Sequence, residues 1–250
     1  MELLRAEGIT KDYDGKPVLR DVTVSLEEGE LVSILGLSGS GKTTLLNIIS
    51  GLIQPDRGRV LLQGQDVTGK PGQISYMLQK DLLLAHKRVI DNVCLPLVIA
   101  GMKKEEARKK ADAHFSTFGL EGTQMLYPAQ LSGGMRQRAA LMRTWLCSRG
   151  VMLLDEPFSA LDMITRAQMH EWYLSVMRSI SLSTILITHD VDEAILLSDR
   201  ICLLTGSPGM IREEIRIETP REERKDFMLT PAFLEYKRQV TAALRGRENG

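Results

Sequence analysis

The sequence predicts an α/β fold in which helices flank a mostly parallel β-sheet. Short, largely apolar runs recur along the chain, among them residues 151–154 and 185–187, and such runs suit strands that are covered on both faces. Stretches with helical periodicity and helix-end signals, such as residues 133–148 and 191–197, alternate with these runs. Strands that alternate with helices favour a parallel sheet.

Residues 36–44, GLSGSGKTT, contain the most specific pattern in the chain. Gly36, Gly41, Lys42 and Thr43 fit the P-loop spacing of Gly, four residues, Gly, Lys, then Ser or Thr. Small residues let backbone N–H groups wrap around phosphates, and the start of the following helix adds the positive end of its dipole. We expect Lys42 to reach the β- and γ-phosphates and the Thr43 hydroxyl to bind Mg²⁺. The nucleotide-binding residues expected in this loop are Gly36, Leu37, Ser38, Gly39, Ser40, Gly41, Lys42, Thr43 and Thr44.

The sequence around this loop supports the prediction. Residues 30–35 form a short apolar run that suits a buried strand, and residues 44–49 continue as a buried helix that Gly51 ends. A glycine-rich turn without a ligand is the alternative, and the Lys-Thr pair after a strand argues against it.

Bulk composition limits the classes of function. The 250 residues can form one large or two small domains, and 43% hydrophobic residues is ordinary for a water-soluble protein. The 32 basic and 32 acidic residues cancel, so net charge gives no reason to bind nucleic acid or an anionic membrane. No apolar run approaches the ~20 residues that span a bilayer, and the N-terminus lacks a signal-peptide pattern. We therefore expect a cytosolic chain whose membrane role, if any, requires a partner.

The three cysteines, Cys94, Cys147 and Cys202, lie far apart in apolar surroundings. They fit neither a metal-binding pattern nor a disulfide framework, so we expect buried, reduced thiols.

The N-terminal segment predicts two strands, at residues 3–10 and 18–26. The turn-rich stretch 11–16 between them contains Tyr13. This ring could stack on a purine base or pack at a strand edge, and residue type alone favours packing at the edge.

Four polar residues follow apolar strands: Gln79, Asp155, Glu156 and His189. Ligands bind at the carboxyl ends of strands in open α/β sheets, so each residue is a candidate for the site. Asp155 can hold Mg²⁺ through water, and Glu156 can orient or deprotonate an attacking water. His189 adds a titratable donor at the same edge. A polar residue that merely ends a strand is the alternative for Gln79, and the stronger one for Gln79 taken alone; a side chain that only faces solvent is the alternative for Glu156.

Residues 131–138, LSGGMRQR, predict a second helix start that can bind an anion. Ser132 can cap a helix that runs to about Ser148, and the two glycines after it leave the N–H groups uncovered. Further on, residues 159–162 predict a turn that caps the next helix.

Two other helices are predicted. Residues 103–118 form a charged amphipathic helix that Gly119 closes, with acidic residues among its basic ones, so we expect a solvated face and no nucleic-acid patch. His114 has no nearby Cys or His partner and is expected to be structural. A helix over residues 232–244 follows in the charged C-terminal part of the chain.

The order of these motifs resembles the nucleotide-binding subunit of an ATP-binding-cassette (ABC) transporter, over residues 1 to about 205. The resemblance implies a P-loop NTPase fold with an N-terminal antiparallel β subdomain and a helical signature subdomain at about 82–148. It implies one ABC ATPase domain over residues 1–250, with a C-terminal tail at about 206–250.

The resemblance also implies roles for individual residues. Tyr13 is similar to the aromatic that stacks on adenine, which reverses the preference for edge packing. Gln79 resembles the Q-loop residue that contacts Mg²⁺ and senses the membrane partner. Glu156 resembles the catalytic base, Asp162 the D-loop acid and His189 the switch histidine.

Ser132, Gly133 and Gly134 resemble the signature that grips the γ-phosphate of ATP bound to a second copy. The resemblance therefore implies a head-to-tail dimer with two ATP molecules between the copies, which opens after hydrolysis.

A closer likeness is to the importer branch for nitrate, sulfonate, taurine and thiamine-precursor pyrimidines. It is carried by residues 82–97, 131–144, 155–166, 187–201 and 206–215. Implied partners are integral membrane permease subunits and, indirectly, an extracytoplasmic solute-binding protein, with this chain on the cytoplasmic face of the membrane. His86 and Lys87 depart from the branch, which often has Pro-Trp there.

Two other functions compete with the role of transporter ATPase. A non-transport ABC ATPase that acts on nucleic acid or ribosomes usually has two cassettes or a long coiled-coil insertion, and this chain has neither. Its neutral charge also argues against a nucleic-acid partner. A small-molecule P-loop kinase would have no use for the LSGG helix start or the strand-end histidine.

Overall fold

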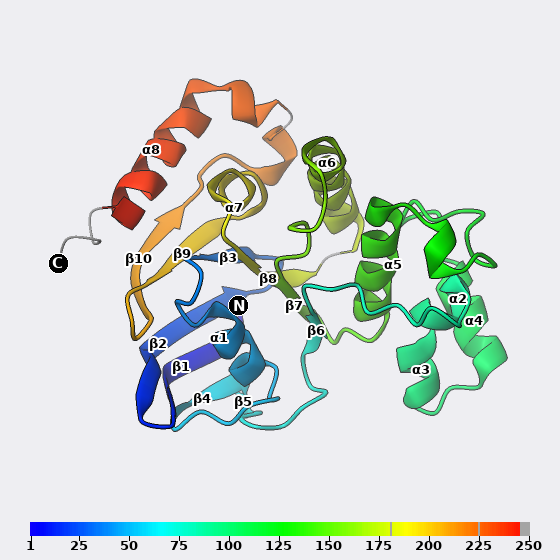
Figure 1. Ribbon diagram of the computed structural model, residues 1–250, viewed down its shortest axis with the longest axis horizontal. Coiled ribbons are helices and arrows are strands. Elements are labelled where there is room, and N and C mark those ends of the chain that lie inside the picture. The colour runs from blue at the N-terminus through cyan, green and yellow to red at the C-terminus, as the bar shows by residue number, and fades with distance from the viewer. Residues whose placement is uncertain (181, 225, 246–250) are drawn as a thin grey trace. The chain divides into compact units, whose positions relative to one another are not determined.

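The computed structural model describes residues 1–180, 182–224 and 226–245, which divide between two compact units (Figure 1). The first unit combines Met1–Ile74 with Ser181–Gly250, and the second is Ser75–Ile180.

Two sheets form the strand framework of the first unit. An antiparallel sheet has the order β2-β1-β4-β5, from β1 (Glu2–Tyr13), β2 (Lys16–Glu27), β4 (Arg57–Leu62) and β5 (Gln65–Asp66). The other strands are β3 (Leu31–Leu35), β8 (Ser183–Thr188), β9 (Arg200–Thr205) and β10 (Met210–Arg216). β3 pairs in parallel with both β8 and β9, and β10 runs antiparallel to β9. Every residue of β3 and β8 is buried, as the apolar runs predicted.

The first hairpin corrects one sequence-based expectation. The strands were expected to end near residue 10 and to resume near residue 18, yet β1 continues to Tyr13 and β2 begins at Lys16. Asp14 and Gly15 both have positive φ, 50° and 77°, as in the two-residue turns that match the twist of paired strands. The turn is therefore only two residues long, and Tyr13 is the last residue of β1.

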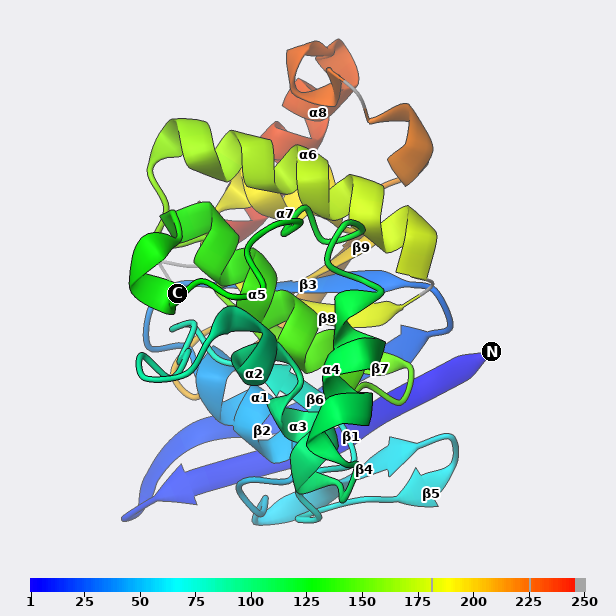
Figure 2. The same cartoon turned by 90° about the vertical axis from the view of Figure 1, so that its right-hand side faces the viewer.

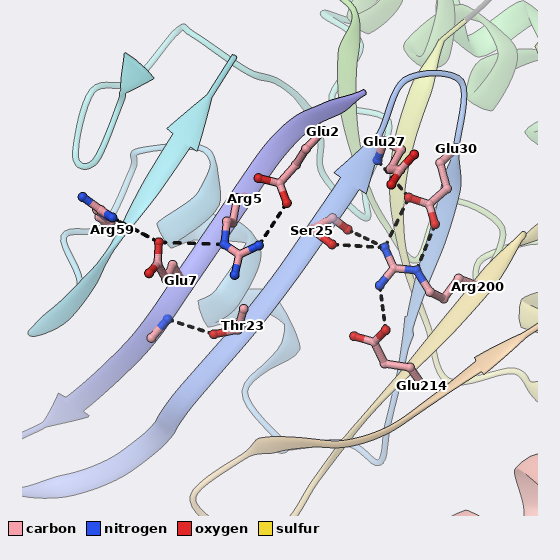
Figure 3. Close-up of polar contacts among 11 residues, drawn as sticks. Glu2, Arg5, Glu7, Thr23, Ser25, Glu27, Glu30, Arg59, Arg200 and Glu214 are labelled. Atoms are coloured by element: carbon pink, nitrogen blue, oxygen red, sulfur yellow. Dashed lines mark hydrogen bonds and ion pairs between the residues drawn. The ribbon is translucent and has the colours of Figure 1, made fainter. Parts of the chain in front are cut away.

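The buried Arg200 links the two sheets of this unit (Figure 3). Its Nε donates to Glu30 Oε1 at 2.9 Å, and its Nη1 donates to Glu214 Oε2 at 2.9 Å. Its Nη2 donates to the Ser25 carbonyl of β2 at 2.8 Å. Burying a guanidinium costs free energy unless its donors are paired, and these contacts supply partners from β2, from β10 and from the turn before β3.

The helices of the first unit are α1 (Lys42–Ile49), α7 (Val191–Leu197) and α8 (Pro231–Arg245), with short 3₁₀ turns η2 (Arg221–Glu223) and η3 (Phe227–Leu229). The predicted helix at 191–197 is confirmed, and the predicted helix at 232–244 is confirmed within one residue at each end.

The second unit is mostly helical (Figure 2). Its strands β6 (Ser75–Met77) and β7 (Val151–Asp155) pair in parallel. Its helices are α2 (Val89–Val93), α3 (Leu95–Ile99), α4 (Lys104–Asp112), α5 (Gly133–Leu146) and α6 (Met163–Ile180), with the 3₁₀ turn η1 (Pro128–Gln130). An aromatic cluster lies in its core, where Phe118 packs 5.3 Å from Trp145 and 6.1 Å from Trp172 between ring centres. His114 packs edge-on against Trp145, as expected of a structural histidine.

The helix predicted over residues 103–118 is too long, because α4 ends at Asp112. After it the backbone tightens: the N–H groups of His114 and Phe115 bond to carbonyls three residues earlier. These turns bury Phe115 and Phe118, and Gly119, at φ 63°, ends the segment. The charged residues of α4 are exposed, as expected, except Arg108, which is half-buried and donates to Asp91 Oδ2 at 2.7 Å.

None of the helices in the described parts of the chain combines the length and the apolar composition needed to cross a membrane.

Candidate functional site

The P-loop, residues 36–44, connects β3 to α1 in the first unit (Figure 1). Gly39 and Gly41 have φ values of 84° and 93°, which side chains rarely adopt. A Cβ atom at Gly36 would lie 2.1 Å from the Leu204 carbonyl oxygen, and one at Gly41 would lie 2.7 Å from Leu19 Cδ2. Glycine is therefore required at both ends of the loop, and the residues between them that face solvent are Leu37, Ser38 and Gly39.

Lys42 lies inside this loop and is only 7% exposed. Its Nζ donates to the Gly36 and Leu37 carbonyls, each at 2.8 Å. The Ser40 Oγ is buried and has no hydrogen-bond partner among the described residues, and no side chain caps the start of α1. A buried ammonium, an unsatisfied hydroxyl and an uncapped helix start all fit a bound phosphate group.

His189 follows the strand next to the P-loop strand. Leu35 and Thr188 are partners at the ends of β3 and β8, so Gly36 and His189 leave adjacent strand ends. His189 is exposed, and Asp190 caps α7 by accepting from the Asp192 N–H at 2.9 Å. The structure thus brings the expected switch histidine to the same sheet edge as the P-loop.

Tyr13 is 41% exposed at the end of β1. The Lys11 Nζ lies 5.4 Å from the centre of its ring, on one face. Adenine stacking by Tyr13 stays a prediction.

Asp155 and Tyr76 are neighbours in the second unit. Asp155 ends β7 and is buried, and the Tyr76 hydroxyl donates to its Oδ2 at 3.2 Å. Burial, together with the charge of Asp155, raises the pKa of Tyr76, so the hydroxyl stays protonated as a donor. Sequence reasoning missed Tyr76; its place on the strand that pairs with β7 could not be read from the chain order.

Gln79 and Glu156 come together in this unit, although 77 residues separate them. The Gln79 Nε2 donates to Glu156 Oε2 at 3.2 Å and to Ser159 Oγ at 3.3 Å. The Ser159 Oγ in turn donates to the Glu156 carbonyl at 2.9 Å. Glu156 has a φ of 46°, a conformation that costs roughly 1–3 kcal/mol in a non-glycine residue and that clusters at functional sites. The turn at Ser159 holds this conformation, a role that the sequence analysis did not assign to it.

The segment after Gln79 is fixed by two side chains that the sequence analysis did not select. The buried Asn92 Nδ2 donates to the Leu84 carbonyl at 3.1 Å, and its Oδ1 accepts from the Leu84 N–H at 2.6 Å. Arg143 of α5 donates to the Leu82 carbonyl at 2.9 Å and to the Asp81 carbonyl at 2.6 Å. Arg143, which holds the expected Q-loop, therefore belongs to α5, the helix that begins at the LSGG motif (the signature helix).

The predicted helix start at the LSGG motif is confirmed. The Ser132 Oγ accepts from the Met135 N–H at 3.2 Å, and α5 begins at Gly133. Ser132 is exposed, whereas Gly134 is buried. This arrangement presents a hydroxyl and a helix N-terminus at one place, which suits an anion.

The turn that ends at Asp162 lies against the same helix start. A Cβ atom on Gly134 would lie 3.2 Å from Thr165 Cγ2, in the first turn of α6. The Asp162 Oδ1 accepts from the Ile164 and Thr165 N–H groups at 3.1 and 3.0 Å, which confirms the predicted cap. A hydrogen bond from the Thr165 side chain, with further backbone N–H bonds, lowers the pKa of Asp162.

The candidate Mg²⁺ residues are Thr43, Gln79 and Asp155. Thr43 is exposed in the first turn of α1, and Gln79 is exposed after β6. Within the described residues, no three His, Cys, Asp or Glu side chains are grouped so that they could hold a metal ion.

The prediction that all three cysteines are buried is wrong for one of them. All three thiols are free, and Cys94 and Cys202 are buried, but Cys147 is exposed. Cys147 is the C-cap residue of α5, where the helix ends at the surface. Burial raises the pKa of both Cys94 and Cys202, which keeps their thiols neutral.

The family resemblance implies an ATPase, and we expect the variant Cys94→Ala, Cys147→Ser, Cys202→Ala to retain its ATP turnover within about twofold. The two buried thiols are neutral and therefore poor nucleophiles, and Cys147 is not among the expected site residues. The stability of the variant is expected to fall by about 1 kcal/mol for each methyl-sized cavity at the two buried sites. Steady-state phosphate release and thermal unfolding would measure the two effects. A folded variant without turnover would show that a thiol takes part in the reaction.

The ABC transporter family matches residues 19–159, more than half of the chain. The chain belongs to the ABC transporter family. This ABC protein is 40% identical over 245 residues to a formylaminopyrimidine import ATP-binding protein of Halalkalibacterium halodurans, covering 98% of the chain and 95% of that protein. It is also 40% identical over 215 residues to a taurine import ATP-binding protein of Yersinia pestis, covering 86% and 84%.

Solved structures agree with this assignment. The dimeric structure of a bacterial ABC transporter cassette matches the chain with a TM-score of 0.74 and 29% identity, covering 87% of this chain and all of that one. The predicted P-loop NTPase fold, with its antiparallel N-terminal sheet and helical part, is therefore confirmed, as is the predicted class of ATP-binding transport subunit.

Proposed function

We propose that this ABC protein binds and hydrolyses ATP, and that two copies energise the import of a small solute through a separate membrane permease. The observation that carries the proposal is the P-loop: a loop that requires glycine at both ends, is exposed at residues 37–39 and surrounds a buried lysine, at the sheet edge that also carries His189. Two relatives that match most of the chain are named import ATP-binding proteins, which supports a transport role. The proposal treats residues 1–250 as one ATPase domain.

In this proposal the P-loop binds the phosphates through its backbone N–H groups. Lys42 exchanges its two loop carbonyls for phosphate oxygens, whose greater negative charge makes stronger hydrogen bonds. Tyr13 stacks on the adenine ring. Mg²⁺, when bound, would be held by Thr43, Gln79 and Asp155 together with phosphate oxygens and water, and would offset the negative charge of the phosphates.

Glu156 is proposed to take a proton from the attacking water. Its hydrogen bond from Gln79 and the positive-φ turn hold the carboxylate in one orientation, so little reorganisation is needed before reaction. Gln79 directly precedes the segment that Arg143 fixes at Asp81 and Leu82, and we propose that this segment transmits the binding of a membrane partner to the base. His189 is proposed to contact the γ-phosphate.

The signature residues Ser132, Gly133 and Gly134 are proposed to bind ATP held by a second copy, with Asp162 nearby. The dimeric state of the matched cassette structure supports this assembly. The γ-phosphate would then hold the closed dimer together, and its loss would favour opening.

This chain is not expected to contact the transported solute, so its sequence does not identify that solute. The two relatives are equally identical to this chain, at 40%, yet their names carry different solutes. We propose that this chain lies on the cytoplasmic face of the membrane and that an extracytoplasmic solute-binding protein is an indirect partner. Binding measurements on that partner would identify the solute.

A tagged copy of the chain in its native cell would test the transport role. We expect detergent-solubilised membranes to yield the chain with a multi-span permease, and we expect that permease to change its ATP turnover. Recovery with ribosomes or nucleic acid, and without a permease, would favour the non-transport alternative.

Ser132→Arg is expected to abolish turnover while each monomer still binds ATP through its own P-loop, because the bulky cation blocks the signature of one copy from the nucleotide of the other. Mixing it with Lys42→Ala chains should recover activity that neither variant has alone, at no more than one site per dimer. Nucleotide titration of the monomer and phosphate release from the mixture would measure both.

Ser116→Arg is the matched control, since Ser116 is exposed on the surface of the same unit. It should bind and hydrolyse ATP as the unaltered chain does. Loss of ATP binding by an isolated Ser132→Arg monomer would contradict a role in trans.

A further inference from the structure

The C-terminal segment is attached to α7, the helix that follows His189 (Figure 1). The centre of this attachment is Arg224, which is 3% exposed. Its Nη1 donates to the Leu196 carbonyl at 3.0 Å and to the Ser198 carbonyl at 2.7 Å. Its Nε and Nη2 donate to the Thr219 carbonyl at 3.0 and 2.8 Å.

These contacts place a buried cation at the C-terminal end of α7. The last carbonyls of a helix lack partners within it and carry its partial negative charge, so a guanidinium there both satisfies and neutralises them. Burial lowers the pKa of Arg224 to about 10, which leaves the side chain charged at neutral pH. Removing a buried side chain of this kind would leave several carbonyls unsatisfied at once.

A second contact lies at the other end of α7. Lys237 of α8 pairs with Asp192, in the first turn of α7, at 2.7 Å. Both side chains are partly exposed, so this pair contributes less than the Arg224 contacts. The C-terminal segment therefore contacts α7 at both ends.

The position of α7 bears directly on His189. On one side of His189, β8 ends at Thr188, which is fixed by its pairing with β3. On the other side, Asp190 caps α7 through its side chain. Because α7 has only seven residues, a shift of the helix at its C-terminal end is expected to move Asp190 and His189 with it.

We propose that Arg224 is a positioning residue for His189, acting through α7. The C-terminal segment would then contribute to the rate of ATP hydrolysis. The inference rests on the proposed role of His189 at the γ-phosphate. Arg224 lies beyond residues 19–159, to which the family match extends, and beyond the motifs of the sequence analysis, the last of which ends at residue 215.

Arg224→Met and Arg224→Lys test this in the full chain. We expect Arg224→Met to lower kcat about tenfold or more while the KM for ATP changes less than about threefold, because the P-loop is untouched. Arg224→Lys keeps the charge but cannot reach all of the carbonyls, so its kcat should lie between those of Arg224→Met and the unaltered chain. Arg238→Met is the control: Arg238 is exposed on α8, and its loss should leave kcat unchanged.

A double-mutant cycle separates positioning from general destabilisation. In a His189→Ala background, either Arg224 change should lower kcat by less than about twofold, because the residue through which it acts is already absent. Equal losses with and without His189 would overturn the positioning role, as would a folded Arg224→Lys chain with unchanged kcat. If Arg224→Met does not fold, the cycle is carried out with Arg224→Lys.

The cycle also separates this inference from the proposed function. Full turnover by His189→Ala would remove the proposed role of His189, and with it the positioning role of Arg224. A strong loss in His189→Ala with additive Arg224 effects would remove only the positioning role.

Discussion

Glu156→Gln is expected to lower the rate of ATP turnover by about 10²–10⁴-fold, because this is the usual contribution of a general base. ATP binding should be retained. The amide loses the charge and the basicity of the carboxylate. Its oxygen can still accept the hydrogen bond that Gln79 Nε2 now gives to Glu156 at 3.2 Å, so the local geometry should survive. Single-turnover phosphate release and nucleotide titration measure the two quantities separately.

Glu121→Gln provides the matched control, because Glu121 is an exposed carboxylate of the same unit. It should hydrolyse ATP at the unaltered rate. If Glu156→Gln also did so, another group would be the base, and His189 would be the next residue to replace.

Lys42→Ala is expected to weaken ATP binding by roughly 10–100-fold and to remove hydrolysis. The estimate follows from the typical value of a hydrogen bond to a charged group, roughly 1.5–3 kcal/mol. Lys42 also holds the loop through the Gly36 and Leu37 carbonyls, so its loss should loosen the phosphate site as well. Calorimetric titration with ATP and with ADP would measure the change.

Lys109→Ala, at an exposed position of α4, removes the same charge without touching the loop. Its affinity for ATP should be unchanged. Near-normal turnover by Lys42→Ala would show that residues 36–44 are not the nucleotide site.

Sequence patterns predicted the parts of the fold that depend on local signals. The apolar runs of β3, β7 and β8 are buried along their whole length, and the caps at Ser132 and Asp162 are present. The predicted helix end at residue 118 was wrong, and α4 ends at Asp112. Helical periodicity does not distinguish an α-helix from the tighter turns that bury Phe115 and Phe118 here.

Long-range contacts explain what was missed around the site. Tyr76 meets Asp155 only through strand pairing, and Arg143 meets Leu82 across 61 residues. The left-handed backbone at Glu156 has no signature in a residue that is not glycine. Cys147 is exposed because α5 ends there, a boundary that composition does not locate.

Arg224 illustrates the same limit in the C-terminal segment. In sequence it is one charge in a charged stretch, and only the fold brings it to the carbonyls of α7, 26 to 29 residues away.

The mass of Glu156→Gln in solution tests the central claim most directly, namely that ATP joins two copies of this chain through their signature helices. Light scattering after gel filtration should give one copy without nucleotide, two copies holding two ATP molecules when ATP is present, and one copy when ADP replaces ATP. A mass of one copy at saturating ATP, with ATP bound and hydrolysis stopped, would contradict the claim that ATP alone closes the dimer.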